Sequence, residues 1–340
     1  MSVASTRARK AQKPGPYLAP VASFHPTADT GDFMQRFTSR ACVIAALLLV
    51  ALTSWPAMAA TYPVPYIFEP TAALHPNVAP AGTDIWSCRP TRQHPYPVVL
   101  VNGTFANMAD NWTTFGPLLA NQGYCVFAFN YGALDPLNEI GGLRSAESSA
   151  ATIGTFIHRV LVATRAKKVD IVGHSQGTID PDYYAKFLGG APYIARYVSL
   201  APVWHGADAL AVGKLYTLLS SLGVGGPAAA TIDLVCGACR EFAPGSAFMT
   251  KMRSNGGPAI PGIVYTNIVT QYDEIVVPYT SGIEPGMQNI IVQHGCPADR
   301  ADHLALAYDR RAAVAVLNAL DPAHPRPLPC PNTLPYLGSG

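Results

Sequence analysis

The stretch Val169-Asp170-Ile171-Val172-Gly173-His174-Ser175-Gln176-Gly177 is an apolar run that ends on Gly-x-Ser-x-Gly. This pattern is typical of a nucleophile elbow, in which a strand turns sharply into a helix and leaves the serine hydroxyl exposed on a strained corner. Gly173 and Gly177 are expected there because strand and helix approach too closely for side chains. The alternative is an ordinary glycine-rich turn, since so short a motif also occurs by chance.

Strand and helix patterns alternate on both sides of this stretch. Apolar, β-branched runs predict strands at 97–102, 124–129, 169–172, 196–201, 262–270 and 287–292. Amphipathic or small-residue segments predict helices at 112–121, 145–164, 182–188 and 302–320. Such alternation predicts a doubly wound, mostly parallel sheet in a single α/β domain.

Three segments depart from the alternation. Residues 61–96 are rich in proline and aromatics without a sustained period, and we expect an arm that wraps the domain. Residues 203–260 interrupt the sheet pattern with an apolar helical stretch at 209–222, which is either a lid over the site or a core-packing helix. Residues 321–340 form a proline-rich tail.

The N-terminal residues predict export. Residues 34–59 contain basic Arg36 and Arg40, an apolar core at 41–52 and a small-x-small end at 57–59, as in a signal peptide. We expect cleavage near Ala59, which leaves residues 60–340 as one secreted domain, with residues 1–33 as an upstream extension. The net charge of +2 gives no electrostatic reason to expect nucleic-acid binding.

Cysteine usage agrees with export. Outside the signal, six cysteines remain, an even set that suggests disulfides in an exported chain. Proximity along the chain favours three pairs: Cys88–Cys125 across the first two core strands, Cys236–Cys239 as a local clip, and Cys296–Cys330 anchoring the tail. The Cys-x-x-Cys pair is alternatively a redox or zinc motif, but it has no second pair of ligands nearby.

An activated serine needs a base that takes its proton and a carboxylate that holds the base in one tautomer. In hydrolases with a sheet of this kind the chain order is serine, carboxylate, histidine, each after a strand. The carboxylate that follows a predicted strand after Ser175 is Asp273, with its neighbour Glu274 as the alternative.

Three histidines follow Asp273 in the chain, and they differ in position. His324 lies in the tail, and His294 directly ends a predicted strand, where it has suitable geometry for a base. His303 begins the predicted last helix from a loop, a position that suits a base moving towards Ser175. The pattern favours His303 and leaves His294 open.

The developing oxyanion of an acyl transfer needs two backbone donors. One is expected from the N–H of Gln176, directly after the nucleophile. The other is expected from the loop after the first core strand, where Thr104 follows Gly103 and its hydroxyl is a candidate third donor. Alternatively Gly103 and Thr104 only form a turn.

Five blocks of the sequence together resemble the secreted bacterial class 2 lipases (triacylglycerol lipases and esterases) of the α/β-hydrolase superfamily. They are Leu100-Val101-Asn102-Gly103-Thr104, Gly173-His174-Ser175-Gln176-Gly177, Ala201-Pro202 with His205-Gly206, Tyr272-Asp273-Glu274-Ile275-Val276-Val277-Pro278-Tyr279, and Asp302-His303-Leu304-Ala305-Leu306. The similarity spans about residues 85–320, and the last two blocks are more specific than the elbow.

The resemblance implies an α/β-hydrolase fold with a lid or cap insertion and a catalytic triad of Ser175, Asp273 and His303, so it favours His303 over His294. It also implies secretion, disulfides and no required cofactor or metal. We expect a monomer that acts on lipid or other carboxylic esters, with a lipid–water interface as one possible setting. The rival functions are a polyester or cutin hydrolase, an acyltransferase with the same triad, and a non-catalytic exported binding protein.

The sequence departs from the family pattern in two places. Asn102 stands where many members carry histidine, a change that leaves the backbone role of the loop intact. Gly177-Thr178-Ile179-Asp180-Pro181 replaces a commoner Gly-Gly-x pattern and puts Asp180 close behind the elbow.

Overall fold

The computed structural model describes residues 61–134, 136–138, 140–207 and 236–340, which lie within one compact unit, Ala59–Gly340. The predicted signal peptide at 34–59 and the predicted lid helix at 209–222 fall outside the described residues. Within the described ranges, no helix has the length and apolar character needed to cross a bilayer.

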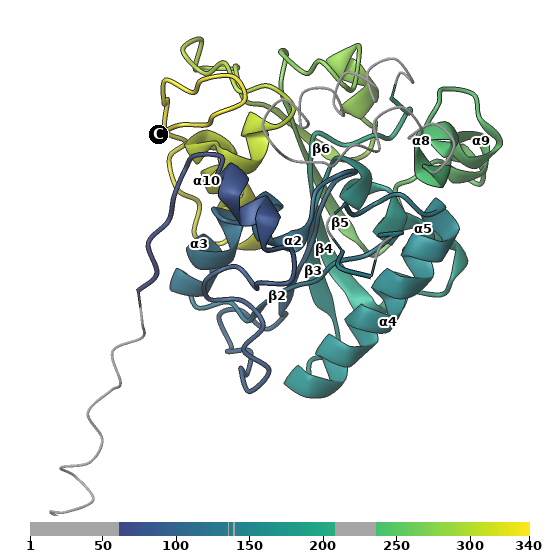
Figure 1. The fold of residues 1–340 in the computed structure, drawn as a ribbon, viewed down its shortest axis with the longest axis horizontal. Coiled ribbons are helices and arrows are strands. Elements are labelled where there is room, and N and C mark those ends of the chain that lie inside the picture. Colours follow the sequence, from purple (N-terminus) through teal and green to yellow (C-terminus); the bar gives the residue numbers. More distant parts are fainter. Residues whose placement is uncertain (1–60, 135, 139, 208–235) are drawn as a thin grey trace, which may run out of the picture. The chain divides into compact units, whose positions relative to one another are not determined.

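In the described residues, six strands form one parallel sheet in the order β2-β1-β3-β4-β5-β6 (Figure 1). The strands are β1 (Val98–Val101), β2 (Val126–Ala128), β3 (Val169–His174), β4 (Ile194–Leu200), β5 (Val264–Val269) and β6 (Gln288–Ile291). Every neighbouring pair is parallel, which confirms the predicted sheet. The strand that carries the Gly-x-Ser-x-Gly motif, β3, lies inside the sheet, so its carboxyl end is flanked by loops from both sides.

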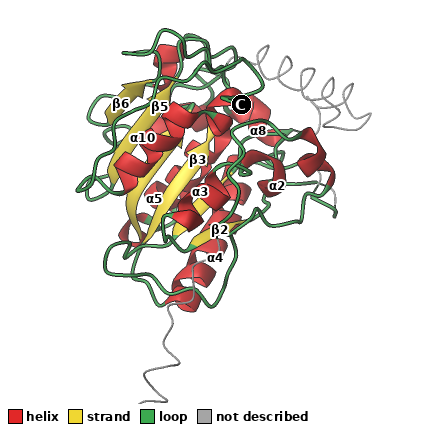
Figure 2. Ribbon diagram, turned by 90° about the vertical axis from the view of Figure 1, so that its left-hand side faces the viewer, coloured by secondary structure: helices red, strands yellow, loops and turns green. Residues whose placement is uncertain are grey.

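Helices cover both faces of the sheet (Figures 1 and 2). In the described ranges, the α-helices are α2 (Met108–Asn111), α3 (Phe115–Asn121), α4 (Ala146–Thr164), α5 (Asp180–Phe187), α8 (Gly237–Glu241), α9 (Ala247–Arg253) and α10 (Arg310–Leu320). Short 3-10 helices are η1 (Pro70–Leu74), η2 (Ser175–Thr178), η3 (Ala191–Tyr193), η5 (Tyr279–Gly282) and η6 (Ala305–Tyr308). One face packs against α4 and α5, and the other packs against α3 and α10.

The strands are apolar on both sides because each side contacts a helix layer. In β1, Val99 and Val101 belong to the core under α4 and α5, whereas Val98 and Leu100 belong to the core under α3 and α10. All four side chains are fully buried. Continuous β-branched runs in the sequence therefore mark central strands of this sheet.

Two predicted helix starts are wrong. The last helix begins at Arg310 and not at residue 302, because the Asp309 side chain accepts a hydrogen bond from the N–H of Ala312 and caps the helix there. Consequently His303 lies in a turn before η6. The helix predicted at 112–121 begins at Phe115, and α2 before it was not predicted.

The arm and the tail hold each other on the domain surface. The Phe68 N–H donates to the Leu337 carbonyl (2.8 Å), and the Ser339 N–H donates to the Tyr66 carbonyl (2.8 Å). Disulfides join the three expected cysteine pairs, Cys88–Cys125, Cys236–Cys239 and Cys296–Cys330. One detail differs, because Cys88 lies in the arm and not in β1. The first disulfide therefore ties the arm to the start of β2.

Candidate active site

Ser175 lies at the sharp turn between β3 and η2. Its φ angle of +54° is in the left-handed region, which a residue with a side chain seldom adopts. A Cβ atom on Gly173 would lie 2.0 Å from the Gly177 carbonyl oxygen, and one on Gly177 would lie 2.0 Å from the Val101 carbonyl oxygen. Only glycine fits at both positions, so the local geometry is that of the predicted elbow.

His303 and Asp273 form a buried hydrogen-bonded pair. The Nδ1 atom of His303 lies 2.9 Å from Oδ1 and 3.1 Å from Oδ2 of Asp273. Asp273 Oδ1 also accepts the backbone N–H groups of Ile275 (3.0 Å) and Val276 (2.8 Å), which fix the carboxylate. The second ring nitrogen, His303 Nε2, is buried and has no hydrogen-bond partner among the described residues, so it is free to act on a substrate-side group.

The surroundings of His303 set its proton affinity. Burial lowers the pKa of the ring, but the charge and hydrogen bond of Asp273, with smaller contributions from Glu274 and Asp302, raise it, and the pKa ends above its ordinary value. Glu274 accepts the backbone N–H of His303 (3.2 Å) and does not hold the ring. The structure therefore pairs His303 with Asp273 and not with Glu274.

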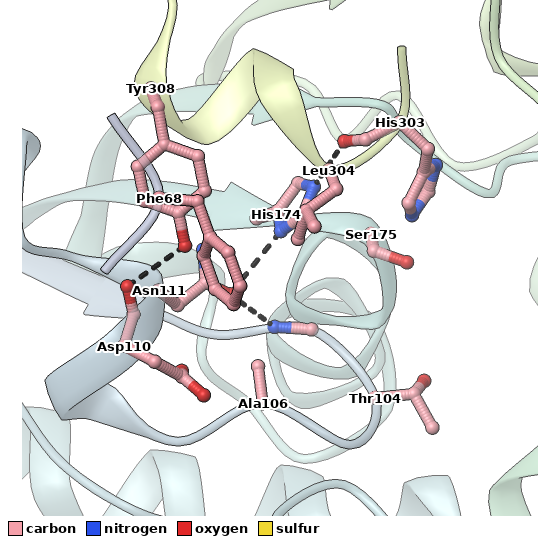
Figure 3. Close-up of a pocket in the computed structure, with 11 residues that line it drawn as sticks. Phe68, Thr104, Ala106, Asp110, Asn111, His174, Ser175, His303, Leu304 and Tyr308 are labelled. Atoms are coloured by element: carbon pink, nitrogen blue, oxygen red, sulfur yellow. Dashed lines mark hydrogen bonds between the residues drawn. The ribbon is translucent and has the colours of Figure 1, made fainter. Parts of the chain in front are cut away.

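One cavity brings the serine and the histidine together (Figure 3). Ser175, His303 and Thr104 all line a space of about 380 Å³ that includes its open mouth. The apolar part of the lining comes from Phe68, Ala106, Leu304 and Tyr308. Asp273 lies behind His303, outside the lining. No hydrogen bond joins His303 Nε2 to Ser175 in this arrangement.

His174 lines this cavity and links the elbow to two neighbouring segments. Its Nε2 atom lies 3.0 Å from the His303 carbonyl oxygen, and its Nδ1 atom lies 3.2 Å from Asn111 Oδ1. Asn111 Oδ1 also accepts the N–H of Gly103 (2.9 Å). Burial lowers the pKa of His174 to about 3, so the ring is neutral. Asn111 has no sequence signal, because it belongs to the unpredicted helix α2.

The expected oxyanion donors belong to the two segments next to Ser175. Gln176 is the second residue of η2, where the first N–H groups of a helix have no intrahelical partner. Thr104 follows Gly103, whose α-carbon packs against Ser175, since a Cβ there would lie 3.1 Å from Ser175 Cβ. The Thr104 hydroxyl donates to Gln176 Oε1 (2.6 Å). That hydroxyl is therefore engaged by Gln176 and does not serve as the expected third donor here.

The other candidate histidines lie apart from the site. His294 is exposed in the turn after β6, and His324 is exposed in the tail, where its ring pairs with Asp321 (3.0 Å). Neither lines the cavity beside Ser175. In the described part of the chain, no group of three or more His, Cys, Asp or Glu side chains has a geometry that holds a metal ion. Cys236 and Cys239, the candidate zinc or redox pair, are joined as a disulfide.

Comparison with known proteins agrees with the geometry. Residues 95–189 match the family of class 2 lipases. The triacylglycerol lipases of Pseudarthrobacter phenanthrenivorans and Burkholderia plantarii are each 34% identical over 95 residues, which cover 26% of this chain and 28% and 25% of theirs. The match thus spans about a quarter of the length of these curated relatives.

A solved structure extends the likeness of the fold. Aspergillus fumigatus lipase B superposes with a TM-score of 0.52 at 18% sequence identity, over 74% of this chain and 56% of that chain. The fold is that of an α/β-hydrolase, as expected. The segment that matches the class 2 lipases contains Thr104, Ser175 and Gln176 but ends before Asp273 and His303. The pairing of those last two residues with Ser175 rests on the geometry of the cavity.

Proposed function

We propose that this protein is a serine ester hydrolase that cleaves carboxylic esters of lipids, triacylglycerols included, through an acyl-enzyme on Ser175. The observation that carries the proposal is the cavity that Ser175 and His303 both line. Asp273 holds the His303 ring by a hydrogen bond to Nδ1. The class 2 lipase segment and the relatives named triacylglycerol lipases support the substrate class.

In the first half of the reaction, His303 Nε2 takes the proton of the Ser175 hydroxyl while Oγ attacks the ester carbonyl. Asp273 accepts the Nδ1–H bond, which fixes the tautomer and stabilises the imidazolium that forms. His303 Nε2 has no hydrogen-bond partner among the described residues, so it is available to accept this proton. The backbone N–H groups of Thr104 and Gln176 stabilise the negative charge on the carbonyl oxygen.

In the second half, the imidazolium of His303 gives its proton to the leaving alcohol, and the acyl group stays on Ser175. Water then enters, loses a proton to His303 and attacks the acyl carbonyl. The same two N–H groups stabilise the second tetrahedral intermediate. Release of the carboxylic acid returns the proton to Ser175 Oγ and restores the starting site.

The setting of the reaction is part of the proposal. The signal-like residues 34–59 and the three disulfides fit an enzyme that is exported and cleaved near Ala59. We further propose a monomer whose insertion at 203–260 covers the ester at a lipid–water interface. Intact-mass analysis of secreted protein tests the cleavage point, and a rate jump on emulsified substrate tests the lid.

The experiment that tests the function compares the wild type with Ser175→Ala. We expect the wild type to hydrolyse p-nitrophenyl esters and a triglyceride emulsion and to incorporate one organophosphate label, and Ser175→Ala to lose both activity and label while melting at the same temperature. Retained turnover in Ser175→Ala overturns the mechanism. A wild type that is neither labelled nor active favours a binding protein, whereas faster release of polymer fragments or ester exchange favours a polyester hydrolase or an acyltransferase.

A further inference from the structure

Asp180 is a buried carboxyl group directly behind the elbow, at the start of α5. It has no exposed surface and forms no ion pair with any described residue. Its Oδ2 atom accepts a hydrogen bond from Gln176 Nε2 (2.8 Å), and its Oδ1 atom has no partner among the described residues. Burial of a polar group is costly unless its hydrogen bonds are satisfied, so a buried carboxyl with one partnerless oxygen calls for an explanation.

The hydrogen bond of Asp180 is the first step of a three-residue chain that reaches the oxyanion loop. Gln176 is also fully buried, and its Oε1 atom accepts the Thr104 hydroxyl (2.6 Å). Because Asp180 takes the amide N–H and Thr104 gives its hydroxyl to the amide oxygen, both ends of the Gln176 amide are fixed. The chain therefore runs from Asp180 through Gln176 to Thr104.

The space around the Gln176 amide leaves little freedom. A Cβ atom on Gly142 would lie 2.7 Å from Gln176 Oε1 and 3.0 Å from Thr104 Cα. The neighbouring Gly141 carbonyl accepts the N–H of Phe105 (3.0 Å), so this backbone is itself bonded to the oxyanion loop. The Gln176 side chain thus packs between α5 and the Thr104 loop with its orientation set by the chain of hydrogen bonds.

We propose that Asp180 is a positioning residue that, through the Gln176 amide, holds Thr104 so that the backbone N–H groups of Thr104 and Gln176 converge on one oxyanion. This inference rests on the proposed ester hydrolysis. Gln176 supplies one of the two donors from its backbone and fixes the residue of the other donor with its side chain. Donors of this kind stabilise the transition state only when they are held in place before charge develops.

The charge state of Asp180 provides a conservative variant. Burial raises the pKa of this carboxyl well above its ordinary value, which favours the neutral form. Asn is then close to Asp in shape and charge, and its side-chain oxygen still accepts the Gln176 amide. Leu has a similar size but no acceptor.

Asp182 supplies a matched control on the same helix. It is fully buried, burial raises its pKa to about 7, and it bonds to Tyr265 (2.7 Å) and not to the site. Asp180→Leu and Asp182→Leu each remove one buried carboxyl, so both destabilise the protein by the same physical means. Only Asp180→Leu disturbs the Gln176 amide.

The test measures kcat and KM on one soluble p-nitrophenyl ester. We expect Asp180→Leu to lower kcat about 10- to 100-fold with KM changed less than about threefold, Asp180→Asn to stay within about threefold of wild type, and Asp182→Leu to keep wild-type kcat. Thr104→Val, a variant at a half-buried position, should lower kcat about tenfold. In the double variant of Asp180→Leu and Thr104→Val, the two losses in kcat should not multiply, because both substitutions break the same chain of hydrogen bonds.

The proposal is overturned if Asp180→Leu keeps wild-type kcat, if Asp182→Leu loses as much, or if the losses of Asp180→Leu and Thr104→Val multiply. Multiplication would mean that the Thr104 hydroxyl contacts the oxyanion itself. If Asp180→Leu does not fold, wild-type kcat in Thr104→Val overturns the proposal alone. These outcomes leave ester hydrolysis intact, whereas a wild type without turnover or organophosphate labelling overturns the proposed function together with this inference.

Discussion

The Nε2 atom of His174 lies 3.0 Å from the backbone carbonyl oxygen of His303, so the residue before the proposed nucleophile contacts the turn that carries the proposed base. The two rings lie 5.2 Å apart between centroids. The neutral ring of His174 has one N–H, and because a carbonyl oxygen can only accept, the contact with His303 is a hydrogen bond in the tautomer with that proton on Nε2. The elbow and the base are thus joined by a hydrogen bond that does not take part in proton transfer.

His174→Phe should test this link. Phe fills the same space but cannot donate to the His303 carbonyl, and a displaced base loses alignment with Ser175. We expect kcat to fall about 10- to 100-fold with a small change in KM, since a misplacement of about 1 Å can cost that much. His158→Phe, at an exposed position on α4, is the control. Wild-type kcat in His174→Phe would show that the turn holds His303 without this bond.

Asp273→Asn should reduce kcat/KM by about 10⁴ at neutral pH. The amide oxygen can still accept the N–H groups of Ile275 and Val276, so its NH₂ group faces His303 Nδ1 and favours the wrong tautomer of the ring. Steady-state kinetics with one soluble ester measures the loss. A comparable loss in Glu274→Gln with little loss in Asp273→Asn would reverse the choice of carboxylate.

The sheet was predictable because its strands are buried on both faces, which leaves uninterrupted apolar runs such as 97–102 and 169–172. The start of the last helix was not predictable. The helical spacing of apolar residues from Leu304 to Tyr308 continues into α10, although η6 and Asp309 separate that segment from the helix. Asp309 within this segment was the available signal of a helix start, but the helical spacing of the apolar residues around it favoured one continuous helix.

The candidate site was also only partly predictable from the sequence. Ser175 and Asp273 were predicted from a motif and a strand end, and His303 from its loop position and the family resemblance. The structure brings Ser175 and His303 to one cavity, with Asp273 bonded to the ring. Phe68 and Asn111 also line that cavity and were missed. Their place depends on how the arm and α2 pack, which no local pattern encodes.

The activity should have an acid limb above pH 6.5. His303 acts as a base only when it is neutral, and its folded-state pKa lies above the ordinary 6.5, so kcat/KM falls as pH drops through that raised value. Glu274→Gln removes one of the negative neighbours that raise the pKa of His303. The acid limb of the pH–rate profile should therefore move to lower pH by less than about one unit. A pH–rate profile of both proteins measures the shift, and movement to higher pH would contradict this account.

Phe68→Ala should widen the range of esters accepted. The Phe68 ring is buried, lies 5.5 Å from the Tyr308 ring and forms part of the cavity wall beside Ser175. We expect kcat/KM for branched or longer esters to rise relative to the smallest ester, and stability to fall by about 3 kcal/mol through the cavity created. Phe68→Leu should lie between the two proteins. An unchanged substrate ratio would show that the arm does not limit the ester.

Removal of the Cys296–Cys330 disulfide should destabilise the protein more than removal of Cys236–Cys239. The first closes a loop of 34 residues and the second a loop of 3, so loop-closure entropy predicts losses of about 4 and about 1.5 kcal/mol in the free energy of unfolding. Urea unfolding of the two double Cys→Ser variants measures the difference. In the first variant the tail would still be held by the backbone bonds between arm and tail, so the folded state survives and the loss comes from the greater freedom of the unfolded chain. An equal loss in both variants would mean that strain or local packing, and not chain entropy, sets the contribution of these bridges.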